Sequence, residues 1–136
     1  MRVVLDTNVL LSADHVLLHV STDFLAMVGV KLTLETLDDM ERNYQYRPSV
    51  IGILPTFFDR RTKISREVVS LLKEHFGKKV FRTHIRANTQ LKESPSFHKT
   101  IFEYAPSSSG SEDYFSLTEE VLERIGETHG RDKDIG

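Results

Sequence analysis

Short apolar runs alternate along this chain with longer segments whose apolar residues recur at helical spacing. The runs are rich in valine, isoleucine and leucine, which predicts strands over residues 2–5, 14–20, 50–58 and 80–85. The helical spacing predicts helices over residues 24–44, 62–76 and 111–125. Because strands alternate with helices, the sequence predicts an α/β fold with a mostly parallel sheet and helices on both faces.

Capping residues mark the ends of these helices. Ser21-Thr22-Asp23 can cap the first helix, and either Thr62 or Ser65 can cap the second. Gly77 is expected to end the second helix, and Ser111 to begin the third.

The remaining segments are expected to be less regular. Residues 86–100 are polar and predict a loop with a short helical turn, and residues 101–104 predict an edge strand. Residues 1–125 are expected to form one domain, and residues 126–136 a flexible charged tail.

Composition narrows the class of protein. The 136 residues include no cysteine and no apolar run long enough to cross a bilayer, and the segment after Met1 shows no export signal. We therefore expect a cytoplasmic protein without disulfides, thiolate metal sites or membrane insertion.

The net charge of −2 conceals a segregated basic segment. Residues 60–99 contain eleven lysines and arginines against three glutamates, a net +8, so the rest of the chain carries −10. Such segregation favours a polyanionic partner, because contacts to phosphate release bound counterions.

Ser49–Gly77, SVIGILPTFFDRRTKISREVVSLLKEHFG, is the most informative segment. An apolar strand runs through Pro55-Thr56 into a polar turn and a helix with a basic start. An open α/β sheet presents ligand-binding groups in this order at the carboxyl ends of its strands. Together with SADHVLLHV before it and the blocks from VFRTHIRANTQ to LTEEVL after it, this segment resembles partition ATPases. From about Ala13 to Arg124, the chain resembles the C-terminal half of the ParA/Soj/MinD type, the deviant Walker A family.

The resemblance implies a truncated P-loop NTPase (Rossmann-like) fold and a role in chromosome or plasmid partitioning. It implies ATP and Mg²⁺ as cofactors, non-specific DNA binding, a ParB-like partner and ParA-like dimerisation. A deviant Walker A loop needs a glycine-rich turn and lysines that hold phosphate, and no pair among the seven glycines of this sequence brackets such a loop. We therefore expect a truncated form that keeps remnants of the ATP site and does not hydrolyse ATP alone.

The resemblance also assigns individual residues. Pro55 and Thr56 stand at the strand end that faces adenine, and Arg86 and Asn88 stand in the loop near the base. Asp6, at the end of a predicted strand, would join the Mg²⁺ shell through a water molecule. The region through which ParA dimers hold the DNA backbone contains Arg60, Arg61, Arg82 and Arg86.

Two other functions are compatible with the sequence. Met1–Ala13 resembles the start of a PIN-domain ribonuclease of the toxin class. Asp6 would then be the first ligand of Mg²⁺ or Mn²⁺, with Glu35, Glu41 or Asp113 as further ligands. The third function is a non-enzymatic module that binds DNA or regulates a full-length ParA.

Overall fold

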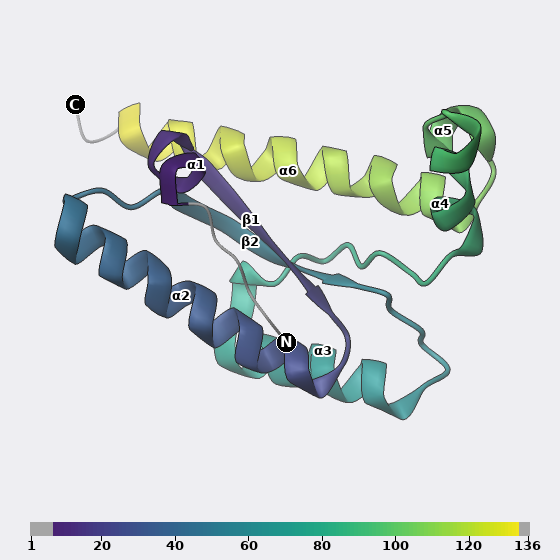
Figure 1. The fold of residues 1–136 in the computed structure, drawn as a ribbon, viewed down its shortest axis with the longest axis horizontal. Coiled ribbons are helices and arrows are strands. Elements are labelled where there is room, and N and C mark those ends of the chain that lie inside the picture. Colours follow the sequence, from purple (N-terminus) through teal and green to yellow (C-terminus); the bar gives the residue numbers. More distant parts are fainter. Residues whose placement is uncertain (1–6, 134–136) are drawn as a thin grey trace.

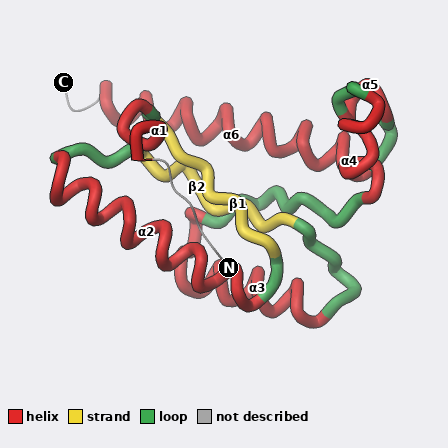
Figure 2. Tube along the Cα trace, in the orientation of Figure 1, coloured by secondary structure: helices red, strands yellow, loops and turns green. Residues whose placement is uncertain are grey.

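The computed structural model describes residues 7–133, and side chains from residue 9 to residue 127. Its sheet consists of two parallel strands, β1 (His15–Ser21) and β2 (Ser49–Thr56). The register pairs His15 with Ser49 and Ser21 with Thr56, so the carboxyl ends of both strands meet at one edge. Figure 2 shows the two strands between layers of helices. This arrangement confirms the predicted α/β class with a parallel sheet.

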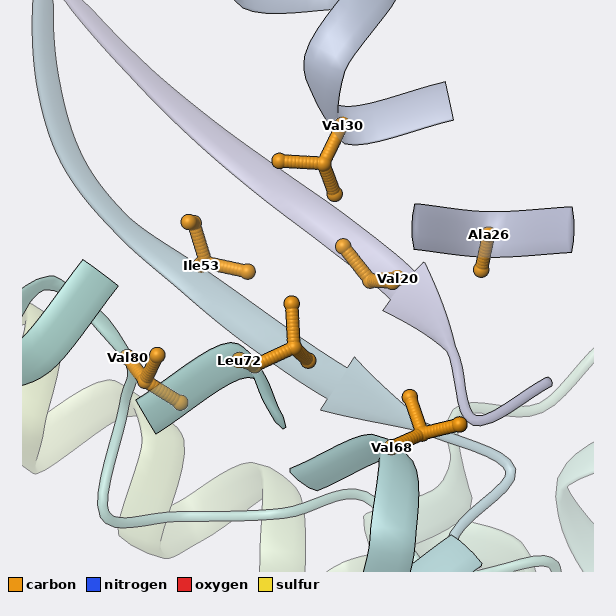
Figure 3. Packing of buried hydrophobic residues seen from close by; sticks show 7 residues of the cluster. All are labelled: Val20, Ala26, Val30, Ile53, Val68, Leu72 and Val80. Carbon is orange, nitrogen blue, oxygen red and sulfur yellow. The ribbon is translucent and has the colours of Figure 1, made fainter. Parts of the chain in front are cut away.

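Helices α2 (Phe24–Tyr44) and α3 (Lys63–Phe76) lie together on one face of the sheet (Figure 1). Both contribute to an apolar cluster with the strands, which Figure 3 shows from close by. The cluster consists of Val20, Ala26, Val30, Ile53, Val68, Leu72 and Val80. Because the buried residues of α3 recur at three- and four-residue spacing, this face agrees with the predicted helical pattern.

The caps of these two helices follow the sequence signals. The Asp23 side chain accepts the Ala26 N–H at the start of α2, and the Thr62 side chain accepts the Ser65 N–H at the start of α3. Gly77 ends α3 at a φ of 54°. Of the two predicted caps of α3, the structure therefore selects Thr62.

The long helix α6 (Ser109–Lys133) covers the opposite face of the sheet (Figure 1). The Ser108 hydroxyl accepts the Ser111 N–H at its start, so the expectation that Ser111 caps this helix was wrong. The helix also continues past Ile125, where the sequence predicted its end, and the flexibility of residues 126–136 stays a prediction. Over residues 7–133, no helix combines the length and the apolar character that a membrane crossing requires.

The segment over residues 80–85 is not a regular strand, contrary to the prediction. Phe81 N–H donates to the Ile53 carbonyl at 2.8 Å, and Ile85 N–H donates to the Pro55 carbonyl at 2.9 Å, so the segment does follow β2. Between these two bonds, the N–H groups of Arg82 and Thr83 donate to the Glu120 carboxylate of α6. Because a side chain of α6 takes the donors that a strand would use, only isolated bridges remain.

Short helices make up the rest of the described chain: α1 (Thr7–Ser12), η1 (Gly77–Lys79), α4 (Thr89–Glu93), η2 (Ser94–Phe97) and α5 (Ile101–Tyr104). The edge strand predicted over residues 101–104 was wrong, because Thr100 and Glu103 form a capping box that begins α5. The helical turn expected within residues 86–100 is present as α4 and η2. The strand predicted over residues 2–5 lies outside the described residues.

Candidate functional site

A pocket of about 470 Å³ lies at the carboxyl ends of the two strands. The ends of β1 and β2, the segment over residues 85–88, α4 and α6 form its walls. Its lining is mostly apolar and comprises Leu17, His19, Leu54, Thr56, Phe57, Ile85, Arg86, Asn88, Leu91, Lys92, Tyr114 and Leu117. Open α/β sheets bind ligands at this edge, and apolar walls with a few polar groups are typical of sites for small molecules. The structure thus brings Thr56, Arg86 and Asn88 together at one pocket.

Thr56 has unused hydrogen-bonding capacity in this pocket. The residue is only 8% exposed, and its Oγ1 is buried without a hydrogen-bond partner. An unpaired buried hydroxyl costs about 1–3 kcal/mol. Because buried polar groups are nearly always paired, this hydroxyl is a candidate to bond a ligand, which would reach the buried Oγ1 after a small shift of the pocket lining.

Pro55 lies near the end of β2, where the sequence placed it, and its role toward a nucleotide stays a prediction. Its side chain is fully buried, and it is absent from the pocket lining. Its carbonyl accepts the Ile85 N–H at 2.9 Å. Pro55 therefore holds the neighbouring segment against β2, and any effect it has on a ligand in the pocket is indirect.

The Asn88 side chain is occupied by the fold. Its Oδ1 accepts the Leu91 N–H at 3.2 Å, which caps α4, and its Nδ2 donates to Ser109 Oγ at 2.7 Å. The two bonds connect the start of α4 to the start of α6. Asn88 lines the pocket, but its polar atoms already have protein partners.

Arg86 is likewise held by carboxylates of α6. Its guanidinium donates to both oxygens of Asp113 and to Glu112 Oε2, at 2.8 to 3.1 Å, and its backbone N–H also donates to Asp113. The hydrogen bonds that Arg86 donates to Asp113, followed by the one that it donates to Glu112, raise the pKa of Arg86 above its usual range. Asp113 is only 7% exposed, so Arg86 neutralises a carboxylate that the fold has buried.

Phe57 is the strained residue at the edge of the pocket. Its φ is 51°, in the left-handed region that aromatic residues rarely adopt, and its side chain is 59% exposed. Two hydrogen bonds keep this conformation: Thr22 Oγ1 donates to the Phe57 carbonyl at 3.1 Å, and Phe58 N–H donates to the Ile85 carbonyl at 3.0 Å. Strain that the surroundings maintain at a pocket is a mark of functional sites.

Of the arginines predicted to contact DNA, Arg60, Arg61 and Arg82 are exposed and Arg86 is half-buried, and most of them are paired with acids. Arg61 binds both oxygens of Asp59, and Arg82 binds Glu123 at 2.8 Å. Hydrogen bonds from the Arg61 side chain and backbone lower the pKa of Asp59 to about 2. Among the described residues, no acid pairs with Arg60, whose carbonyl accepts a bond from Arg66. The net positive charge that this region presents is therefore smaller than the charge counted over residues 60–99 in the sequence.

Sequence reasoning missed the pair Glu120 and Arg124. Glu120 is 3% exposed and accepts bonds from Arg82 N–H, from Thr83 N–H and hydroxyl, and from Arg124, at 2.9 to 3.0 Å. The Arg124 guanidinium also donates to backbone carbonyls of β2 and of the adjoining segment, and lies 4.1 Å from the Phe81 ring centre. The signal was available, because helical spacing puts this pair on the same face as Leu117.

Burial and hydrogen bonding together set the charge state of Glu120. Burial by itself raises the pKa of this carboxyl group. The bonds from Thr83 and Arg82 and the charge of Arg124 outweigh that effect, so the pKa lies below its usual value. Glu120 is therefore a charged, fully partnered anchor between α6 and the segment over residues 80–85.

The ligands expected for a PIN-type metal site do not come together in the described chain. Glu35 and Glu41 lie on the exposed face of α2, while Asp113 is buried against Arg86. Asp6 lies outside the described residues. Within the described part of the chain, no group of three histidines, aspartates or glutamates could hold a metal ion. The nuclease alternative is not favoured.

Comparisons with known proteins agree with the partition resemblance. The chromosome-partitioning ATPase Soj of Thermus thermophilus is 41% identical over 90% of this chain and 49% of its own length. The chromosome partitioning protein ParA of Caulobacter vibrioides is 31% identical over 89% of this chain and 45% of its own length. The solved structure of Cyanothece McdA in complex with ATP has a TM-score of 0.69 over 86% of this chain and 45% of its own.

These comparisons differ in what they establish. At 19% identity the McdA structure shows the fold alone, a truncated P-loop NTPase-like α/β fold, and no family model matches the chain. The chain spans about half the length of the curated relatives that it matches. The resemblance found in the sequence is confirmed: along about nine-tenths of its length, this chain corresponds to about half of a ParA/Soj-type chromosome-partitioning ATPase.

Proposed function

We propose that this chain acts in ParA-type partitioning and supplies the base-side wall of a nucleotide site. The observation that carries the proposal is the pocket at the strand ends, with the unpaired hydroxyl of Thr56 in its lining. An adenine base presents a flat apolar face and a few hydrogen-bonding edges. The leucines, Ile85 and Phe57 of the pocket can pack against the apolar face of the base, and the Thr56 hydroxyl can hydrogen-bond one of its edges.

The same pocket does not fit the phosphates or Mg²⁺ of ATP. Its two cationic side chains are Arg86 and Lys92, and the guanidinium of Arg86 is engaged by Asp113 and Glu112. No glycine-rich loop stands in this sequence to cradle phosphate. Adenosine should therefore bind nearly as well as ATP, and we expect no hydrolysis of ATP by the chain alone. Magnesium-dependent turnover by the purified chain in a single-turnover assay would contradict this.

Binding of nucleosides to Thr56 variants tests the proposal. Thr56→Val replaces the hydroxyl by a methyl group of the same size and should weaken adenosine binding about tenfold, the value of one hydrogen bond to a buried partner. Titration followed by NMR shifts of the pocket residues would measure it. Thr36→Val removes a hydroxyl that bonds only the Leu32 carbonyl of its own helix, and should leave binding unchanged. Equal affinity in both variants would refute the role of Thr56.

The exposed arginines support a weaker, sequence-independent contact with DNA. Arg60 and Arg61 stand at the turn before α3, and the side chains of Arg61 and Arg82 are 86% and 75% exposed. Guanidiniums at such edges can contact phosphates without reading bases. Because Asp59 and Glu123 compete with phosphate for Arg61 and Arg82, we expect modest affinity with a strong dependence on salt.

Duplex binding at two salt concentrations tests this contact. Arg60→Ala/Arg61→Ala should weaken the affinity and reduce its salt dependence between about 50 and 200 mM salt, as measured by fluorescence anisotropy. Arg42→Ala is the matched control, because Arg42 is 73% exposed and paired with Asp39 on α2. An affinity for DNA that does not change with salt concentration would exclude phosphate contacts. DNA binding of this kind would place the chain at the nucleoid in the cytoplasm, and a ParB-like partner stays a prediction.

A further inference from the structure

Two aromatic rings are stacked on the surface of the segment between α4 and α6. The centres of the Phe97 and Tyr104 rings lie 5.0 Å apart, at an interplanar angle of 20°. Phe97 is 57% exposed, and Tyr104 is half-buried. Because Tyr104 covers only one side of Phe97, a further planar group can stack on the exposed ring. We call this pair of residues the aromatic platform.

Hydrogen bonds hold the aromatic platform in place. The Tyr104 hydroxyl donates to Glu93 Oε2 at 3.0 Å, which joins α5 to α4. The capping box of Thr100 and Glu103 fixes the start of α5, and Phe97 is the last residue of η2. Figure 1 shows α4 and α5 together beside the start of α6. A stack that is already ordered loses little freedom when a ligand binds.

The charges around the aromatic platform permit a phosphate-bearing ligand but do not by themselves attract one strongly. Lys92 on α4 and Lys99 before α5 are exposed, and neither forms an ion pair with a described residue. Glu93 and Glu103 are the acids of the same segment, and both accept hydrogen bonds within it. Two lysines and two glutamates over residues 89–104 cancel, so most of the affinity has to come from stacking.

We propose that the aromatic platform binds unpaired bases of a single-stranded nucleic acid, with Lys92 and Lys99 beside it for the phosphates. Every base has a flat face that can stack on an aromatic ring, so such a contact does not depend on sequence. In a duplex the neighbouring base pairs cover these faces, so the platform favours single strands. The proposal needs neither the pocket at the strand ends nor the arginines before α3.

Binding of a single-stranded oligonucleotide to the full chain tests the proposal. A fluorescein-labelled oligothymidine of about ten nucleotides is titrated and followed by fluorescence anisotropy. Phe97→Leu removes the flat ring and keeps an apolar side chain, so it should weaken binding about tenfold. Phe97→Trp supplies a larger ring and should bind at least as tightly as the unchanged chain. Phe115→Leu is the matched control, since Phe115 is 60% exposed on α6, and should leave the affinity unchanged.

A duplex of the same length separates base stacking from phosphate contact. Phe97→Leu should leave the affinity for the duplex unchanged, whereas Arg60→Ala/Arg61→Ala should lower it. Oligothymidine contains no adenine, so Thr56→Val should not alter its binding. A failure of the adenosine pocket would therefore leave the result at Phe97 readable.

Four outcomes would overturn the proposal. The first two are equal affinities of Phe97→Leu and the unchanged chain for oligothymidine, and no binding of oligothymidine at about 1 mM protein. The third is an equal loss of affinity for the duplex in Phe97→Leu, because the ring would then contact the backbone and not a base face. The fourth is a dimer, seen as a doubled mass by light scattering, that Phe97→Leu dissolves, because the platform would then bind a second copy.

Discussion

Two regions of the molecule differ in whether their buried polar groups have hydrogen-bond partners. Under α6, the Glu120 carboxylate accepts bonds from Arg82, Thr83 and Arg124, and Arg124 reaches on to the carbonyls of Ile51 and Val80. At the carboxyl ends of the strands, the Thr56 hydroxyl is buried without a partner, and beside it Phe57 is held at a positive φ.

The contrast separates stability from binding. A fully paired network stabilises one arrangement of α6 against the segment over residues 80–85, and removing one member breaks hydrogen bonds of the others. An unpaired hydroxyl and a strained turn lower the stability of the free protein, and a ligand or partner that meets them recovers it. Substitutions in the two regions should therefore have different effects, which the following predictions examine in order of size.

Glu120→Gln should have the largest effect on stability. It removes the carboxylate charge from a largely buried ion pair, because the side chains of Glu120 and Arg124 are 3% and 17% exposed. Breaking a buried ion pair from one side costs about 3–5 kcal/mol, measurable as a lower midpoint in urea unfolding. Glu119→Gln alters an exposed neighbour and should change stability by no more than about 0.5 kcal/mol. A small effect at Glu120 would mean that α6 is held by its apolar contacts alone.

Gly52→Ala should have the next largest effect. A Cβ at this position would lie 2.4 Å from Phe81 Cε2 and 2.6 Å from Arg124 Nη1, so it would push apart the contacts that anchor α6. Such overpacking costs about 1–3 kcal/mol, measurable by thermal unfolding. Among the described residues, a Cβ at Gly126 would meet no atom within 4 Å, and the residue lies in α6, so Gly126→Ala should raise stability by about 0.5–1 kcal/mol. Equal effects of the two substitutions would refute the close packing at Gly52.

A pair of Thr→Val substitutions compares a satisfied hydroxyl with an unsatisfied one. Thr22 Oγ1 bonds the Phe57 carbonyl and the Ser65 hydroxyl at 3.1 and 3.0 Å, so Thr22→Val should cost about 1–3 kcal/mol. Thr56→Val breaks no bond and removes an unpaired buried hydroxyl, so it should raise stability, by up to about 1–3 kcal/mol. Chemical denaturation of both variants measures the difference. A large loss in Thr56→Val would show that its hydroxyl has a partner in solution.

The pH dependence of stability should show a small effect of His84. Burial, followed by the charge of Lys73, lowers the pKa of His84, and the weaker attractions of Glu120 and Asp113 do not offset this. Below a pH of about 6.5 the unfolded chain therefore binds a proton that the folded chain does not, so the free energy of unfolding falls as the pH decreases. His84→Gln should reduce this slope in urea unfolding between about pH 5 and 7. His98→Asn, which alters an exposed histidine at a positive φ, should leave the slope unchanged.

The pattern of the sequence predicted most of the fold because local rules decide it. The Asp23 and Thr62 caps, the end of α3 at Gly77 and the strands β1 and β2 all follow from capping geometry and apolar runs. The edge strand expected over residues 101–104 failed because the capping box of Thr100 and Glu103 outweighed a short apolar run.

The candidate site was only partly predictable. Thr56, Arg86 and Asn88 do meet at one pocket, as the order of strand ends indicated. Their partners in space were not predictable, because Arg86 pairs with Asp113 and Asn88 with Ser109, residues more than twenty positions away. Arg82 and Arg86 of the basic segment and the acids of α6 looked independent in the sequence, although the fold brings them into contact.

By itself the sequence determined the ParA/Soj resemblance, the helical period of α2 and α3, the strands β1 and β2 and the caps of α2 and α3. The tertiary structure decided how charges and donors are shared across the sheet. In the folded chain the N–H groups of Arg82 and Thr83 donate to the Glu120 carboxylate and not to a neighbouring strand. The Thr56 hydroxyl has no hydrogen-bond partner among the described residues. The physical reason is that a hydrogen bond or ion pair depends on distance in space, and periodicity along a chain does not specify which side chains of distant elements will meet.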